Sequence, residues 1–170
     1  MKKNLAPTLL TLLTGLAIAA FALLLYRAPA DSSGPEQPIP FSHNVQSGIK
    51  QIQCQYCHPY VAYSTFPGIP PVAKCLHCHQ YIIANHPWIQ KEHRFFNTGT
   101  PTPWRKVNYV AEHVLFNHQR HINKRVACQE CHGQVQDLHR LPDKVWRMGM
   151  CLECHHKKGA NVDCWLACHS

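Results

Sequence analysis

The sequence predicts mostly irregular structure with short α-helices, preceded by one long apolar helix near the N-terminus. The chain has 170 residues, about the size of one ordinary domain. From about residue 31 onward it has few long aliphatic runs, so its own side chains can bury only a small core. It also contains ten cysteines and fourteen histidines. A chain with this composition needs covalent crosslinks, metals or cofactors to hold it together.

An apolar segment covers residues 5–26, between a basic start at residues 1–4 and Arg27. Its 22 residues are enough to span a bilayer as a helix. The lysines of the basic start predict that it stays in the cytoplasm. The alternative is a cleaved signal peptide, for which Ala28–Ala30 offers a site, although the apolar run is long for such a peptide. We therefore expect a single-pass anchor, followed by a linker over residues 27–40.

All ten cysteines fall into five motifs of one kind. Four motifs read C-x-x-C-H and the fifth reads C-x-x-x-C-H; they are Cys54–His58, Cys75–His79, Cys128–His132, Cys151–His155 and Cys164–His169. In this pattern both thiols bond to haem and the histidine binds its iron. We predict five covalently bound c-type haems, attached at Cys54, Cys57, Cys75, Cys78, Cys128, Cys131, Cys151, Cys154, Cys164 and Cys168. The predicted proximal iron ligands are His58, His79, His132, His155 and His169.

Other uses of the cysteines explain less of the pattern. Five disulfides would leave the histidine after each pair without a purpose. A zinc site is more often completed by a second cysteine pair or by spaced histidines, and a thioredoxin-like pair needs a βαβ context.

The net charge of +8 is scattered, and the propionates of five haems would offset it, so we expect no nucleic-acid partner. Because c-type haem is attached outside the bacterial cytoplasmic membrane, the motifs also place the domain on the periplasmic side.

The chain repeats itself within the predicted haem domain, residues 41–170. Phe41–His43 lies just before the first motif, and Phe116–His118 lies just before the third. Each run is followed by two haem motifs, which predicts two di-haem modules at about 41–85 and 116–158 and a fifth haem at 159–170. The proline-containing segment between the modules, about 86–115, is expected to be mostly irregular.

The second axial ligand of each iron comes from the remaining histidines and methionines. His43 and His118 are the best candidates because they occupy equivalent places in the two modules. His121 forms an H-x-x-H pair with His118, and His113 and Met148 are further candidates. The remaining histidines are less favoured as ligands: His77, His86, His93, His139 and His156.

Several of these stretches resemble one known family. The stretches Pro103–Val107, His113–His121, Ala127–Gly133 and Met148–His155 look like the pentahaem cytochrome c subunit of alternative complex III, a multihaem cytochrome of class III-like type. The resemblance implies an N-terminal anchor in the membrane and a periplasmic haem domain. The chain departs from the family at Gln46 and Asn108, where many relatives have histidine.

The resemblance implies an electron-transfer subunit of a quinol:electron-acceptor oxidoreductase in a respiratory chain, rather than a catalyst on its own. The implied partners are other membrane, iron–sulfur or cytochrome subunits of a respiratory or photosynthetic complex, and a periplasmic acceptor such as a monohaem cytochrome c or a copper protein. The alternative is a self-sufficient membrane quinol dehydrogenase that feeds a periplasmic reductase, with an open haem near the anchor. A catalytic multihaem reductase often has lysine in place of a proximal histidine, whereas all five motifs here end in histidine.

The motif count predicts the haem content of the purified protein. We expect five covalent haems per chain when haem and protein are quantified together. A value of four would exclude haem attachment at the C-x-x-x-C-H motif. Substituting Cys164 and Cys168 by alanine is expected to lower the content by one haem.

Overall fold

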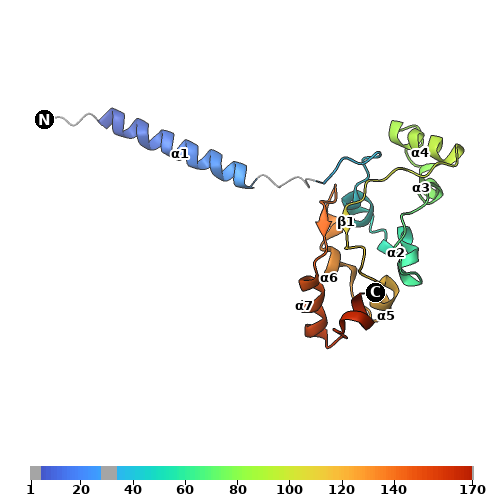
Figure 1. The fold of residues 1–170 in the computed structure, drawn as a ribbon. Helices are drawn as coiled ribbons and strands as arrows, with labels where there is room; N and C mark the ends of the chain where they lie inside the picture. Colours follow the sequence, from blue (N-terminus) through green and yellow to red (C-terminus); the bar gives the residue numbers. More distant parts are fainter. Residues whose placement is uncertain (1–4, 28–33, 170) are drawn as a thin grey trace. The chain divides into compact units, whose positions relative to one another are not determined.

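The computed structural model describes residues 5–27 and 34–169, which belong to two separate units. In the first unit, α1 (Leu5–Arg27) forms over the predicted apolar segment, and its described large apolar side chains are exposed (Figure 1). Across the described residues, no helix is both long enough and apolar enough to cross a membrane. The predicted transmembrane helix over 5–26 is therefore not supported. The predicted cytoplasmic start and residues 28–33 of the predicted linker lie outside the described residues.

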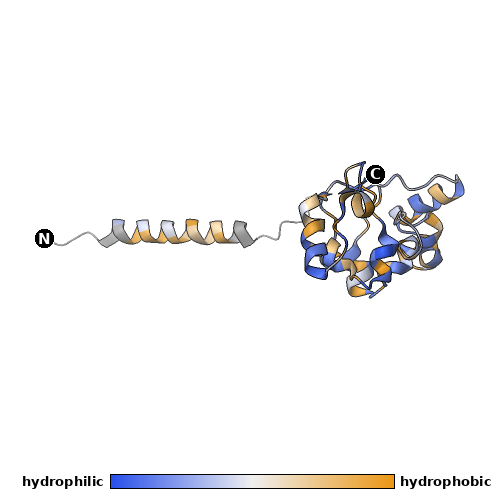
Figure 2. Ribbon diagram, turned by 60° about the horizontal axis from the view of Figure 1, so that its bottom comes forward, coloured by the Kyte–Doolittle hydropathy of each residue, from blue (hydrophilic) through white to orange (hydrophobic). Residues whose placement is uncertain are grey.

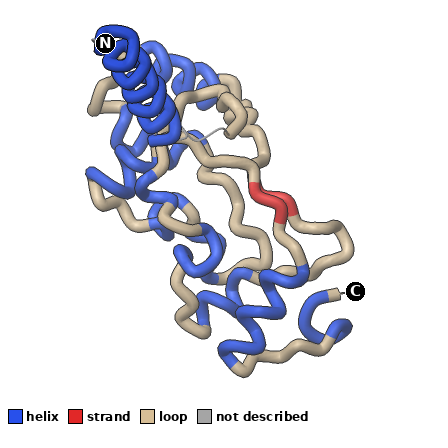
Figure 3. The backbone as a smooth tube through the Cα atoms, turned by 90° about the vertical axis from the view of Figure 1, so that its left-hand side faces the viewer, coloured by secondary structure: helices blue, strands red, loops and turns tan. Residues whose placement is uncertain are grey.

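The second unit consists of short helices joined by long loops, as Figure 3 shows. Its helices are α2 (Cys54–Cys57), α3 (Val72–His79), α4 (Pro87–Asn97), α5 (His118–Asn123), α6 (Cys128–His132) and α7 (Met148–Lys158). Single turns add to these: η1 (Asn44–Ile49), η2 (Pro59–Ala62), η3 (Val135–Asp137) and η4 (Cys164–Cys168). This confirms the prediction of mostly irregular structure with short helices.

Two very short strands, β1 (Asn108–Tyr109) and β2 (Lys144–Val145), pair in parallel. The pairing places Asn108 opposite Lys144, and the Asn108 side-chain oxygen accepts a hydrogen bond of 3.2 Å from the Trp146 indole. Trp146 in turn lies edge-on to His132. The strand pair thus holds Trp146 against His132 of the third haem motif.

The helix α4 is a regular element that was not expected within the segment 86–115, which is otherwise mostly irregular as predicted. Pro87 occupies the first helical position, where a missing N–H costs little. The His86 ring accepts a hydrogen bond from the Trp88 backbone N–H and caps the helix start. Ile89 and Glu92 then lie on one buried face, three residues apart. Pro87 therefore starts α4, and the other prolines of the segment lie beyond the end of this helix.

The described part of the second unit has a very small apolar core. Only four apolar side chains there are buried: Ile39, Val72, Leu76 and Ile89. Figure 2 shows hydrophilic and hydrophobic residues mixed along its helices. The buried polar side chains are Glu92 and Thr102, and the Thr102 hydroxyl donates to the Glu92 carboxylate at 2.9–3.0 Å. Because so little apolar surface is buried, the unit depends on groups other than its own side chains for stability.

The Glu92–Thr102 contact predicts a stability effect. Thr102→Val removes the hydroxyl and leaves a buried carboxylate without its donor, which typically costs about 1–3 kcal/mol. We expect a loss of this size in the free energy of unfolding, measured by guanidinium unfolding followed by circular dichroism. Thr100→Val, at an exposed threonine two residues away, is the matched control. Equal stability of the two variants would show that this contact contributes nothing.

Candidate haem-binding sites

We number the five haem motifs in chain order. All ten cysteines are free thiols, and the first four pairs each lie on a single α-helical turn, in α2, α3, α6 and α7. In motif 1 the His58 backbone N–H donates to the Cys54 carbonyl at 2.9 Å, an i to i+4 bond. One helical turn therefore presents two thiols and an imidazole together, which is the donor set that covalent haem requires.

Motif 5 has one residue more between its cysteines, and the backbone accommodates it in a wider turn. The η4 turn is π-helical, and the His169 N–H donates to the Cys164 carbonyl at 2.8 Å, now an i to i+5 bond. In motifs 1 and 5 alike, the N–H of the histidine thus donates to the carbonyl of the first cysteine. Asp163 starts the turn by accepting from the Trp165 and Leu166 N–H groups. The longer spacing is therefore compatible with the same attachment chemistry.

Backbone carbonyls orient many of the histidine rings. The Nδ1 atoms of the proximal candidates His58, His79 and His155 lie 3.4, 3.2 and 2.6 Å from the carbonyls of Gly68, Ile82 and Asn161. The distal candidates His118 and His121 make the same contact with Thr65 and Asn117, at 3.3 and 2.8 Å. A carbonyl only accepts, so Nδ1 carries the proton and Nε2 keeps its lone pair. This is the tautomer in which Nε2 can bind iron.

One of these carbonyls depends on a glycine. Gly68 has a φ of +63°, and a Cβ there would lie 2.6 Å from the Tyr60 ring. A residue with a side chain would be strained in backbone conformation and would collide with Tyr60. Gly68 therefore allows the chain to turn closely enough for its carbonyl to reach His58.

Three of the predicted distal histidines face predicted proximal ones. The ring centres of His118 and His132 are 6.4 Å apart with planes 8° from parallel, and those of His121 and His155 are 6.1 Å apart. Metal–imidazole bonds are about 2 Å long, so two rings on one iron would have centres about 6 Å apart. The His113 and His169 rings are closer, at 5.2 Å. These pairs match the histidines expected at the irons of motifs 3, 4 and 5.

The fourth predicted distal histidine, His43, lies beside motif 1. Burial lowers its pKa to about 4, and the charge of nearby His58 adds to this effect. Burial also lowers the pKa of His58, His118 and His132. A metal ligand has to be the neutral imidazole, so these four rings are in the state that binds iron at neutral pH.

Within the described residues, the other candidate ligands are not paired with the ring of a proximal histidine. Met148 is 65% exposed in the first turn of α7, so its role as a distal ligand stays a prediction. His86 accepts a hydrogen bond at Nδ1, so its Nε2 carries the proton. The Asn108 side chain accepts the hydrogen bond from the Trp146 indole, so Asn108 has a structural role. His139 contacts the Ser42 hydroxyl at 2.9 Å.

The side chains that lie near one another give the spatial order of the motifs. Lys74, next to motif 2, lies over the ring of Tyr56 in motif 1 at 4.8 Å. Cys54 of motif 1 and Cys128 of motif 3 line one cavity of about 410 Å³. Further along, Lys158 at the end of α7, the helix that carries motif 4, forms a 2.8 Å ion pair with Glu130 of motif 3.

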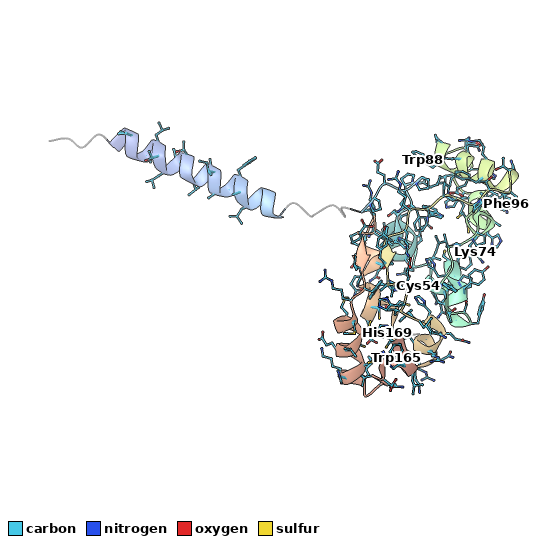
Figure 4. The ribbon with its side chains drawn as sticks, viewed as in Figure 1. Cys54, Lys74, Trp88, Phe96, Trp165 and His169 are labelled. Carbon is cyan, nitrogen blue, oxygen red and sulfur yellow. The ribbon has the colours of Figure 1, made fainter. Side chains whose placement is uncertain are left out.

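Motif 5 follows motif 4 at the other end. Burial raises the pKa of the Cys151 thiol, and the nearby Cys168 of motif 5 adds to this effect. The motifs therefore follow one another in the order 2, 1, 3, 4, 5. Figure 4 shows the same progression, with Lys74 toward one end, Cys54 between, and His169 and Trp165 toward the other.

The paired thiols and neutral imidazoles on short turns, in a domain with little core of its own, define a multihaem c-type cytochrome. No family model matches the chain. It is 28% identical, over 161 aligned positions, to the multihaem cytochrome c subunit of menaquinone reductase from Nitratidesulfovibrio vulgaris strain Hildenborough. The match covers 80% of this chain and 72% of the relative. This similarity supports covalently bound c-type haems and does not test their number.

Sequence reasoning named the cysteines and the candidate histidines, but it did not pair the histidines and it missed the groups that support their rings. The carbonyls that orient the rings come from loop residues such as Thr65, Ile82 and Asn161, whose side chains carry no signal for this role. Only Gly68, in a turn between prolines, offered a hint in the sequence. The edge-on packing of Trp146 on His132 was also missed, although an aromatic residue near a haem motif is a reasonable signal.

The pairing of His118 with His132 predicts a spectroscopic change. His118→Ala removes the second imidazole from one iron, so we expect one haem to pass from low-spin to high-spin. The increase is measured by low-temperature EPR of the oxidised protein, with haem quantified alongside. His139→Ala is the control, because that exposed ring contacts Ser42 and faces no proximal histidine in the described residues. An unchanged spectrum for His118→Ala would rule out this pairing.

Proposed function

We propose that this chain is the electron-transfer subunit of a membrane quinone oxidoreductase. The observation that carries the proposal is the spatial order of the five haem motifs, in which each motif lies near the next. A bound haem supplies one-electron redox chemistry, while the protein sets its position and ligands. The chain's own residues hold each haem by two thiols and orient the imidazole that faces its iron. Such a series carries electrons along the length of the domain.

The partners proposed are quinone-binding membrane subunits at one end and a periplasmic electron carrier at the other. The relative's name places it in a menaquinone reductase, and the sequence resemblance to alternative complex III points to the same class of quinone-linked complexes.

We propose attachment to the bacterial cytoplasmic membrane through α1, with the haem domain on the periplasmic side. This part rests on the sequence, since residues 5–26 contain no charged side chain.

Redox titration with a quinol tests the proposal. The complex is isolated from membranes with its partner subunits, and haem absorbance is followed after menaquinol is added. We expect the haems to be reduced, and we expect menaquinone to reoxidise them after chemical reduction. If neither quinone species changes the haem absorbance, the proposed function is wrong.

The isolated chain separates this proposal from the alternative of a self-sufficient quinol dehydrogenase. Without partner subunits, the haems are expected to stay oxidised with menaquinol but to exchange electrons with a small soluble mediator. Rapid reduction of the isolated chain by menaquinol would favour the alternative. The mediator serves as the control that the haems are intact and accessible.

A further inference from the structure

The internal repeat is also present in the contacts of the structure. The η1 turn precedes motif 1 and packs on η3, which directly follows motif 3. The α5 helix precedes motif 3 and packs on η2, which directly follows motif 1. Each module therefore uses its first segment in the same way, against the first haem motif of the other module. Residues at matching positions of η1 and α5 are expected to have matching roles.

Two further observations support this match between the segments. The Asn44 N–H donates to the Leu138 carbonyl, beyond η3, as the His118 ring contacts the Thr65 carbonyl, beyond η2. Gly48 also lies against η3, and a Cβ there would be 2.5 Å from the Gln136 carbonyl oxygen. The segment that begins at Phe41 thus packs closely on η3, as α5 packs on η2.

The repeat relates position 46 to the ligand of a specific haem. In the second module, His118 faces His132 of motif 3, and His121 faces His155 of motif 4. By the same spacing, His43 corresponds to His118 and serves motif 1. Position 46 corresponds to His121 and therefore serves motif 2, the second motif of its module. That position holds glutamine.

The side chain of Gln46 is free to interact with a bound group. It lies half-buried within the π-helical turn η1, and its side-chain amide makes no hydrogen bond within the described part of the chain. An amide is a much weaker iron ligand than an imidazole. It can, however, donate an N–H to a molecule bound at an iron.

Two of the three remaining histidines near motif 2 are poorly placed to replace the missing one. His77 lies between Cys75 and Cys78, on the attachment turn itself. His86 carries its proton on Nε2, because its Nδ1 accepts the Trp88 N–H. His93 lies on α4, which packs on α3, but among the described rings none is paired with His79. His93 is therefore the one competitor that the experiment has to exclude.

We propose that the haem attached at Cys75 and Cys78, with His79 as its proximal ligand, has no histidine on its other face and binds a small neutral molecule there, beside Gln46. Water in the oxidised state and a diatomic such as carbon monoxide in the reduced state are ligands of this class. The proposal rests on the proposed function only in requiring that the haems are attached. Motif 2 is the end of the series of motifs, so this open iron would stand at the terminus of the electron path (Figure 1).

The test combines EPR of the oxidised protein with carbon monoxide titration of the reduced protein. In the native protein we expect one high-spin haem per chain, and one carbon monoxide bound per chain. Gln46→His is expected to supply the missing imidazole, which makes that haem low-spin and abolishes carbon monoxide binding. Val45→His, an exposed neighbour that is out of register with His121, is the matched control and should leave both signals unchanged. The converse change, His121→Gln, should create a second haem that binds carbon monoxide.

Three results would overturn the proposal. A native protein with only low-spin haems and no carbon monoxide binding would do so, and a high-spin haem that persists in Gln46→His would place the open iron elsewhere. Carbon monoxide binding that appears only after His93→Ala would identify His93 as the ligand. Haem quantification separates these results from a failure of the proposed function, since fewer than five haems concerns attachment and not the sixth ligand.

Discussion

The structure depends on one constraint: the domain buries too little apolar surface to hold itself together. With only Ile39, Val72, Leu76 and Ile89 buried as apolar side chains in its described part, the packing of side chains leaves most segments unfixed. Position is set instead by the turns that carry the cysteine pairs and by hydrogen bonds from imidazole rings to backbone carbonyls. The same bonds that keep each ring in place also decide which nitrogen faces the iron, so stability and ligand chemistry share one set of interactions.

A second level of order comes from the crossed contacts of the two modules. Because η1 lies on η3 and α5 lies on η2, motifs 1 and 3 occupy the centre of the domain and motifs 2 and 4 lie outside them. Motif 5 extends the series beyond motif 4. Duplication of a two-haem unit, followed by crossing of its copies, therefore yields a linear series of sites from a chain that visits them out of order.

Much of this was predictable because haem attachment leaves a fixed local pattern. The choice of the distal candidates His118 and His121, like that of the cysteine pairs and their histidines, followed from spacing and repetition. The spatial order of the motifs did not, because contacts such as Lys158 with Glu130 join distant residues that carry no distinctive signal. The helix α4 was missed because its prolines were taken as breakers, whereas Pro87 starts the helix. The role of Asn108 likewise depends on the pairing of β1 with β2, and strands of two residues leave no recognisable pattern in the sequence.

The crossed contacts also govern how the domain is made. The η1 turn packs on η3, which lies about ninety residues further along the chain. The contacts of η1 can therefore form only after η3 has been synthesised. During synthesis the first module therefore emerges without the surface on which it packs, and its thiols stay accessible in the meantime. Completion of the fold comes only when the second module arrives. Neither module is a domain in its own right, and a chain cut between them would yield two unfinished halves.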